Sequence, residues 1–409
     1  MNDVQPVSSR HTPLTPRHTL LVMAGGTGGH VMPALAVAEA LRGESWRVVW
    51  LGTKAGMEAN LAAAKGFDMA WVNVAGVRGK GLFSRLLLPL NLLVAFWQAA
   101  RVILRERPDI ALGMGGYVSF PGGMMAVLLN IPLVIHEQNA IAGLSNRILA
   151  RIADRVLLGF PQVSGERGAV SGERGAVSGE RGAESWFTPL TAHRSPLTAK
   201  GSPLTTKGEW VGNPVRPEIA ALPAPELRMS GTDGPLRLLV IGGSLGAAAL
   251  NEMIPQALQR LPAAQRPLVR HQSGARHLAA LAKNYALAGV AAETFAFIDN
   301  MAAAYAWAEV VICRGGALTV AEIAAAGLPA LFVPFPFAVD DHQSANAAFL
   351  ADQGAGWLLQ QSALDPEKLA VWLSGLTRAE LLVRAIKARA LAKPDATARV
   401  VAVLKEMAK

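Results

Sequence analysis

Short apolar runs alternate with longer helical patterns along most of the chain. Segments 33–41, 247–261 and 318–326 are Ala-rich and predict helices. The predicted strands are the apolar runs 19–24, 47–51, 110–113, 132–135, 155–158, 236–241, 267–271, 310–313 and 330–333. Since a strand of a parallel sheet is buried on both faces, this alternation predicts an α/β fold in which helices cover both sides of parallel sheets.

Both halves of the chain begin with a strand, a glycine-rich turn and a helix. The first turn is Gly-Gly-Thr-Gly-Gly-His at 25–30, and the second is Gly-Gly-Ser-Leu-Gly-Ala at 242–247. Glycines let the backbone approach a ligand closely, and a helix N-terminus attracts negative charge. The two units predict two doubly wound domains that face one another, each with an anion-binding loop. The alternative for either loop is a tight turn without a ligand.

Composition divides the chain further. Residues 1–17 are polar, lack the apolar core of a signal peptide and are expected to form a disordered leader. Between domains at 18–161 and 210–390 lies an insertion, 162–209, built from near-repeats such as SGERGAV and SPLTAKG. Each repeat carries Gly or Pro and lacks paired apolar positions, which excludes a coiled coil. We expect the insertion to be disordered or loosely ordered.

The net charge of +9 favours an acidic partner, such as a phosphate-bearing substrate, an anionic lipid or a nucleic acid. The single cysteine, Cys313, cannot form an internal disulfide. The longest apolar stretch, 86–100, has 15 residues and contains Pro89, Asn91 and Gln98. A spanning helix needs about 20 mostly apolar residues. The sequence therefore predicts no transmembrane helix.

A cationic segment runs from Arg78 to Arg107. Leu86, Leu90, Leu93 and Trp97 follow one another at helical spacing within it. The cations are Arg78, Lys80, Arg85, Arg101, Arg105 and Arg107, against one acid, Glu106. An apolar helical face flanked by cations suits an anionic membrane surface. The alternative is a helix that faces the core and has solvated ends.

The sequence contains no DxD, no HExxH and no cysteine cluster, so no metal site is predicted. A transferase that works without metal would hold a leaving pyrophosphate with helix N-termini and an arginine. Arg216 and Arg314 are the candidates. For each of them the alternative is a surface ion pair.

Three further side chains carry candidate chemistry. His30 ends the first glycine turn and is either a general base or a histidine held by the backbone. Glu322 lies near the start of a helix, where it either accepts ribose hydroxyls or is merely solvated. Gln343 follows the strand at 330–333, at the sheet edge where polar side chains contact a ligand.

Seven motifs, which occur in order, suggest a family. They are GGTGGHVMPALAVAEAL at 25–41, GVRGKG at 76–81, LGMGGYVSFPGG at 112–123, HEQNAIAGLSN at 136–146, VGNPVR at 211–216, GGSLGA at 242–247 and FIDNMAAAYAWAEVVICRGGALTVAEIAAAGLPALFVPFP at 297–336. Together they resemble glycosyltransferase family 28, and within it the bacterial N-acetylglucosaminyltransferases of peptidoglycan synthesis. The resemblance covers nearly everything from Thr19 onward, apart from the insertion.

The resemblance implies a GT-B fold of two Rossmann-like domains around a cleft, with segment 391–409 returning to the N-terminal domain. It implies inverting transfer of GlcNAc from UDP-GlcNAc to the MurNAc 4-hydroxyl of undecaprenyl-pyrophosphoryl-MurNAc-pentapeptide (lipid I), giving lipid II. The enzyme would need no metal or other cofactor and would bind no nucleic acid. It would be a peripheral protein on the cytoplasmic face of the bacterial inner membrane, serving cell-wall synthesis, cell shape and cell division.

The family pattern also implies site residues. The Ile298 backbone would meet uracil, Glu322 the ribose and Gln343 the sugar, with His30 beside the acceptor as the candidate base. The residues implied to contact the donor are Thr27, Gly28, Gly29, Asn139, Arg216, Ser244, Ile298, Ala317, Leu318, Thr319, Val320, Ala321, Glu322 and Gln343.

Three positions depart from the family pattern. Leu245 replaces a usual Gln, Gly315 replaces Ser or Ala after Arg314, and Phe337 stands where His is frequent. Three other interpretations stay open. A dinucleotide-dependent oxidoreductase is disfavoured, because neither half shows both GxGxxG and the acidic residue about 20 positions later. A related galactolipid-type glycosyltransferase and a non-catalytic sugar-lipid binding protein are the others.

Overall fold

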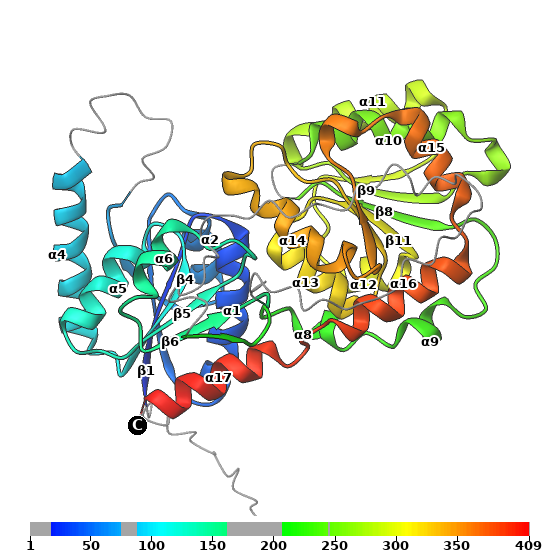
Figure 1. Cartoon of the computed structure of the whole chain (residues 1–409). Helices are drawn as coiled ribbons and strands as arrows, with labels where there is room; N and C mark the ends of the chain where they lie inside the picture. Colours follow the sequence, from blue (N-terminus) through cyan, green and yellow to red (C-terminus); the bar gives the residue numbers. More distant parts are fainter. Residues whose placement is uncertain (1–17, 75–87, 162–206, 244–245, 409) are drawn as a thin grey trace, which may run out of the picture.

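The structure, a computed structural model, describes residues 18–74, 88–161, 207–243 and 246–408. The predicted leader, most of the predicted insertion, Ser244 and Leu245 lie outside these ranges, as do Arg78, Lys80 and Arg85. Two parallel-sheet domains lie side by side, and the chain ends beneath the first of them (Figure 1). The predicted α/β class is confirmed.

The N-terminal domain is built on a seven-stranded sheet of order β3-β2-β1-β4-β5-β6-β7, in which every neighbouring pair is parallel. The strands are β1 (Thr19–Ala24), β2 (Arg47–Gly52), β3 (Asp68–Trp71), β4 (Ile110–Gly115), β5 (Leu133–Glu137), β6 (Arg155–Leu158) and β7 (Gly208–Trp210). The helices are α1 (Gly28–Gly43), α2 (Met57–Ala64), α4 (Leu88–Glu106), α5 (Ser119–Leu128) and α6 (Leu144–Leu149).

The C-terminal domain is built on a six-stranded parallel sheet of order β10-β9-β8-β11-β12-β13. Its strands are β8 (Arg237–Ile241), β9 (Leu268–Gln272), β10 (Glu293–Phe295), β11 (Val310–Cys313), β12 (Ala330–Phe332) and β13 (Gly356–Leu358). Its helices are α8 (Pro217–Ala220), α9 (Pro225–Met229), α10 (Ala248–Arg260), α11 (Leu278–Ala288), α12 (Met301–Trp307), α13 (Ala317–Ala326), α14 (His342–Ala351), α15 (Pro366–Gly375) and α16 (Arg378–Ala390).

In each sheet the first strand lies at the point where the strand order reverses. That point lies between β1 and β4 in the first sheet and between β8 and β11 in the second. Loops that leave adjacent strands in opposite directions open a crevice at the carboxyl end of the sheet, where ligands bind in doubly wound folds. The loops that follow β1, β4, β8 and β11 are therefore the first places to look for a site.

The strand pattern of the sequence missed short edge elements. β7 is a three-residue strand, Gly-Glu-Trp, paired with β6. Residues 208 and 209 were assigned to the insertion and Trp210 to the C-terminal domain, but all three belong to the first sheet. A strand this short and polar gives no apolar run. Helix α1 begins at Gly28, before the predicted 33, because the Thr27 carbonyl accepts hydrogen bonds from the His30 and Val31 backbone N–H groups.

The last helix, α17 (Ala396–Met407), crosses to the N-terminal domain and packs against α1. Val400 and Leu404 are fully buried in the same apolar cluster as Val31 and Leu41 of α1. This burial ties the end of the chain to the first domain, as Figure 1 shows for the red helix. None of the helices in the described part of the chain has both the length and the hydropathy that a membrane span needs.

Candidate active site between the two domains

A buried carboxylate, that of Glu58, holds the first glycine turn in place. Glu58 of α2 is fully buried and accepts hydrogen bonds from the Gly26 backbone N–H (3.1 Å) and from the backbone and hydroxyl of Thr53 (2.9 and 2.8 Å). Gly26 has a φ of +90°, which disfavours any side chain there. The turn is therefore fixed in shape before a ligand arrives.

A second glycine pair, Gly115-Gly116, follows β4 and packs against the first turn. Both residues have positive φ, +99° and +85°. A β-carbon at Gly115 would lie 2.7 Å from the His30 ring, and one at Gly116 would overlap the Gly25 carbonyl. The two turns thus meet at the strand-order reversal and fix the position of His30. The motif at 112–123 contains this pair, but no role for it was predicted from the sequence.

His30 lies in the first turn of α1, with its Nδ1 3.3 Å from the Thr27 hydroxyl. Burial lowers the pKa of the His30 imidazole below its ordinary value. The Glu137 carboxylate and a hydrogen bond with the Gly25 backbone oppose this shift, whereas His342 of the other domain adds to it. A lowered pKa leaves the ring neutral at pH 7, so it can accept a proton.

Asn346 of α14 joins the two domains at the cleft. Its side chain is fully buried. Its Oδ1 accepts a hydrogen bond from the Ala140 N–H (2.8 Å), and its Nδ2 donates to the Gly315 carbonyl (3.0 Å) and to Asn139 Oδ1 (3.2 Å). One side chain therefore connects the loop after β5 to the loop that precedes α13.

The segment between the domains rests on the same β5 loop. His136 Nε2 bonds to the Gly212 carbonyl at 2.9 Å, and Asn213 Nδ2 donates to the Gln138 carbonyl at 3.0 Å. Burial lowers the pKa of His136 to about 4, so the ring is neutral and donates from Nε2. The segment between the domains is therefore held by hydrogen bonds between uncharged groups, and the protonation of these groups does not change near neutral pH.

In the C-terminal domain, Glu322 of α13 is buried with 4 % exposure. Its Oε1 accepts two hydrogen bonds from Arg216, at 3.0 Å from Nε and 2.8 Å from a terminal nitrogen. Its Oε2 accepts one from the Tyr305 hydroxyl at 3.2 Å. Burial raises the pKa of Glu322, although the Arg216 charge and the hydrogen bonds from Arg216 and Tyr305 oppose the rise.

Arg314, the second arginine proposed for a leaving pyrophosphate, is already engaged. It donates to the carbonyls of Val333 and Pro334 and to the Gln361 side chain, at 2.8–3.1 Å. Its structural role is to hold the loop after β12. Both candidate arginines are thus hydrogen-bonded, Arg314 to this loop and Arg216 to Glu322.

The remaining predicted residues are distributed over both domains. Gln343 accepts a hydrogen bond from the Phe335 N–H at 2.9 Å, and Ile298 is partly buried between β10 and α12. Leu318 and Thr319 are partly exposed in the first turn of α13, whereas Ala317, Val320 and Glu322 are buried. The structure also places Thr27, Gly28 and Gly29 beside His30, Asn139 beside Asn346, Arg216 on Glu322, and Ala321 beside Glu322 on α13.

Sequence reasoning missed Glu58, Asn346 and Tyr305. Asn346 stands three positions after Gln343, so both lie on one face of a helix, and that spacing could have indicated it. Glu58 and Tyr305 left no comparable signal, because their partners are 32 and 17 positions away.

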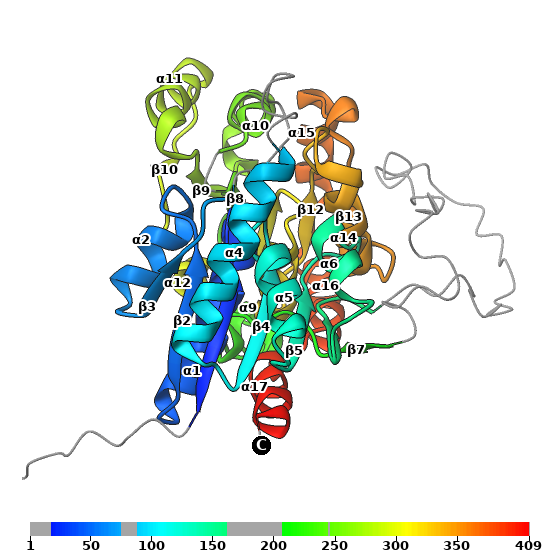
Figure 2. The same ribbon diagram turned by 90° about the vertical axis from the view of Figure 1, so that its left-hand side faces the viewer.

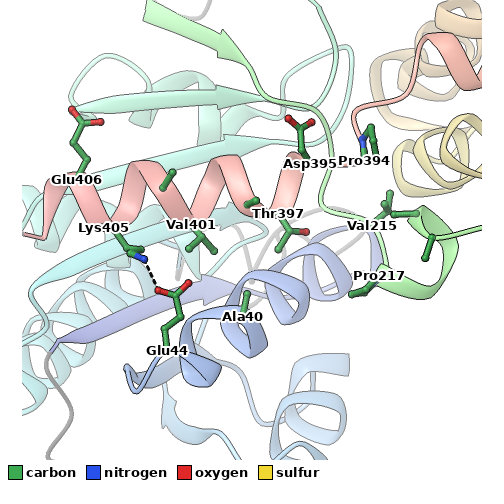
Figure 3. A pocket seen from close by; sticks show the side chains of 14 residues that line it. Ala40, Glu44, Val215, Pro217, Pro394, Asp395, Thr397, Val401, Lys405 and Glu406 are labelled. Atoms are coloured by element: carbon green, nitrogen blue, oxygen red, sulfur yellow. Dashed lines mark hydrogen bonds and ion pairs between the residues drawn. The ribbon is translucent and has the colours of Figure 1, made fainter.

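A groove of about 900 Å³ lies elsewhere, at the end of α1 remote from His30. Figure 3 shows it between α1, α8 and α17, with Ala40, Val215, Pro217 and Val401 in its lining. A bonded pair, Glu44 and Lys405, crosses it. Ala40 lies about 15 Å along α1 from His30, so the groove is separate from the glycine turns, although Val215 and Pro217 flank Arg216.

Helix α4 lies on the outer side of the N-terminal domain (Figure 2). Leu90, Leu93 and Trp97 are 57 %, 64 % and 61 % exposed, and Arg101 lies over the Trp97 ring at 5.6 Å. The alternative of a core-facing apolar stripe is therefore wrong for these residues. The core side of the helix is instead formed by Ala95, Ala99, Val102 and Ile103.

Comparisons with known proteins give matches for both domains. Residues 20–158 match the glycosyltransferase family 28 N-terminal domain, and residues 237–400 match the family's C-terminal domain. The chain is 56 % identical over 391 residues to a protein of Thiobacillus denitrificans and 53 % identical over 390 residues to one of Cupriavidus metallidurans. These alignments cover 96 % and 95 % of this chain and 98 % of each relative. Both relatives are named UDP-N-acetylglucosamine--N-acetylmuramyl-(pentapeptide) pyrophosphoryl-undecaprenol N-acetylglucosamine transferase.

Among solved structures, MurG of Acinetobacter baumannii superposes with a TM-score of 0.73 at 37 % identity, covering 95 % of this chain and 99 % of that one. The calicheamicin glycosyltransferase CalG4 has a TM-score of 0.59 at 15 % identity, covering 96 % of this chain and 98 % of that one, and shows the shared fold alone. Both domains and the GT-B arrangement thus agree, and the chain belongs to glycosyltransferase family 28.

Proposed function

We propose that this enzyme transfers N-acetylglucosamine from UDP-GlcNAc to the MurNAc 4-hydroxyl of lipid I, with inversion, and so makes lipid II for peptidoglycan synthesis. The names of the relatives above state transfer of N-acetylglucosamine between UDP-N-acetylglucosamine and N-acetylmuramyl-(pentapeptide) pyrophosphoryl-undecaprenol. The observation that supports it most directly is the division of the candidate groups between two domains that contact each other through α1 and α13. A neutral His30 lies in the first turn of α1, and the N-terminus of α13 with Arg216 lies in the other domain.

The proposed reaction divides its chemistry between the domains. His30 takes the proton of the acceptor hydroxyl, whose oxygen forms a bond to C1 of GlcNAc from the face opposite the diphosphate. The bond from C1 to the diphosphate oxygen breaks, and UDP leaves with both electrons. The N-terminus of α13, which carries about half a positive charge, and Arg216 stabilise the departing diphosphate. No metal or other cofactor enters the proposal.

The donor contacts follow the family pattern. We assign uracil to the Ile298 backbone, the ribose to Glu322 and the sugar to Gln343 and Asn139. The diphosphate is assigned to Arg216, to the backbone of residues 317–321 and, by the family pattern, to Ser244. Thr27, Gly28 and Gly29 are assigned to the donor from the N-terminal domain. The bonds between Asn139, Asn346 and Gly315 support this assignment, because they bring the two sides of the cleft together.

We further propose that the cationic segment 78–107, which includes α4, anchors the enzyme to the anionic cytoplasmic face of the inner membrane. Three large apolar side chains there are more than half exposed on one stripe, and Arg101 and Arg107 are also exposed. A contiguous apolar patch with adjacent cations is typical of interfacial helices. The acceptor is itself lipid-linked, so such a contact would bring enzyme and substrate to one surface.

Turnover of UDP-GlcNAc with a water-soluble lipid I analogue, in buffer containing EDTA, tests the proposed function. We expect release of UDP together with a disaccharide product of inverted anomeric configuration. UDP-GlcNAc binding without turnover would favour the non-catalytic alternative. Activity that is lost in EDTA and restored only by Mg²⁺ or Mn²⁺ would contradict the metal-free stabilisation of the diphosphate.

A further inference from the structure

Within the described ranges, the buried hydroxyl of Tyr305 contacts a predicted donor residue, Glu322, and has no role in the proposed reaction. It lies on α12 with 1 % exposure and donates to Glu322 Oε2 at 3.2 Å. Burial and the neighbouring Glu322 raise the pKa of Tyr305 well above its ordinary value. The phenol therefore stays protonated and donates a hydrogen bond at every physiological pH.

The hydrogen bonds of Glu322 leave it little free capacity. An ionised carboxylate offers about four acceptor positions. Arg216 fills two of them at Oε1, and Tyr305 fills one at Oε2. About one position remains for a ribose hydroxyl while all three bonds persist.

Arg216 is also the candidate partner of the donor diphosphate. A guanidinium that turns toward a diphosphate gives up at least part of its contact with Glu322, which frees acceptor positions for the second ribose hydroxyl. Helices α8, α12 and α13 contact one another here, and Arg216 and Tyr305 are the charged and titratable groups that act on Glu322. Cys313 of β11 lies near Tyr305 and stays a neutral thiol, because burial raises its pKa.

We infer that Tyr305 is a positioning residue for donor recognition: its hydroxyl orients the Glu322 carboxylate toward the ribose when Arg216 engages the diphosphate. This inference rests on the proposed assignment of the ribose to Glu322. Tyr305 itself touches no substrate. It fixes Oε2 so that the remaining acceptor positions point in one direction.

The test measures the dissociation constants of UDP and 2′-deoxy-UDP for the wild type and for Tyr305→Phe, by calorimetry on the full chain. The wild type should bind UDP about tenfold or more tightly than 2′-deoxy-UDP, since a hydrogen bond to a charged group is worth about that factor. In Tyr305→Phe this ratio should fall to about two or less, and the Kd for UDP should rise about tenfold. The KM for UDP-GlcNAc should rise similarly, with kcat changed by less than about twofold.

Tyr285→Phe is the matched control. Tyr285 is 3 % exposed in the same domain, and its hydroxyl bonds to His271 at 2.9 Å. Its removal should cost stability without changing the ratio of the two dissociation constants. The pH dependence gives a second readout. The Tyr305 bond lowers the pKa of Glu322, so its loss should move the acid-side weakening of UDP binding to higher pH.

A Tyr305→Phe enzyme that keeps the wild-type ratio and acid limb would overturn the inference. A wild type that does not discriminate between UDP and 2′-deoxy-UDP, yet turns over lipid I analogue normally, would overturn it while leaving the proposed function intact. Discrimination that depends on Tyr305 in a chain without turnover would support the inference and refute the proposed function instead.

Discussion

The Asn346 bridge gives the sharpest test of how the domains are joined. In Asn346→Ala, the Ala140 N–H, the Gly315 carbonyl and Asn139 Oδ1 lose their partner together. A buried group left unpaired costs about 1–3 kcal/mol. Residues 139 and 140 are partly exposed, so water can replace their lost bonds, whereas Gly315 is buried. We therefore expect a total cost of about 2–3 kcal/mol, mostly from Gly315.

Calorimetric unfolding measures this loss. A domain of 150–250 residues loses about 2–4 °C per kcal/mol, so the melting temperature should fall by roughly 4–10 °C. The two domains should also unfold as separate transitions, because a contact between them is gone. Gly315 precedes α13, so the KM for UDP-GlcNAc should rise about tenfold, the factor for one lost hydrogen bond to a charged ligand. Asn346→Asp should be worse than Ala, because a carboxylate oxygen would face the oxygens of Gly315 and Asn139.

Asn284→Ala is the control. The Asn284 side chain donates to the Asn251 carbonyl at 3.0 Å, entirely within the C-terminal domain. It should lower the stability of that domain without separating the transitions or changing the KM. If Asn346→Ala and Asn284→Ala behave alike in all three measurements, the bridge does not couple the domains. An Asn346→Asp protein as stable as wild type would show that the amide orientation used here is incorrect.

Three other predictions follow from the same geometry. His30→Ala should lower kcat by roughly 10²–10⁴-fold and abolish the ascending limb of the pH–rate profile. In the wild type this limb should lie below the ordinary histidine pKa, because burial lowers the pKa of His30. An unchanged kcat would place the base elsewhere. Glu309 is fully buried, and its pKa is lowered because hydrogen bonds and charges from Arg378 and Arg237 outweigh the effect of burial. The ionised Glu309 therefore stabilises the fold above its unfolded-state pKa, and this stabilisation is lost as pH falls through the lowered pKa of the folded state. Glu309→Gln should cost about 3–5 kcal/mol at pH 7, measured by denaturant titration, and much less in acid. Trp97→Ser should reduce co-sedimentation with anionic vesicles while leaving turnover of a soluble acceptor unchanged. The control is Leu287→Ser on α11, where Leu287 is 73 % exposed and its replacement should leave vesicle binding unchanged. Equal binding by both variants would contradict an anchor on α4.

The position of the insertion illustrates how a local pattern can mislead at a boundary. Its near-repeats mark a change of composition but not its exact end. The Gly-Glu-Trp of β7 becomes a strand only because β6 offers a free edge, with Leu158 opposite Trp210. Pairing partners 52 positions away are decided by the folded sheet, and no periodicity in three residues can predict them.

The sequence by itself determined the class, the two glycine turns, and the chemistry available at the site. These features depend on neighbouring residues: apolar runs, glycines with positive φ, and helix starts after strands. It also placed His30, Glu322 and Gln343 at the ends of strands or starts of helices, and the structure agrees with those positions.

The tertiary structure alone decided which groups meet. Glu58 reaches Gly26, Tyr305 and Arg216 converge on Glu322, and Asn346 spans 206 positions to reach Ala140. It also turned the Leu90–Trp97 stripe outward, because the small residues Ala95 and Ala99 let the opposite face pack closely on the domain. Such contacts depend on the order of strands and the docking of two domains, which separate residues in sequence while bringing their side chains within hydrogen-bond distance.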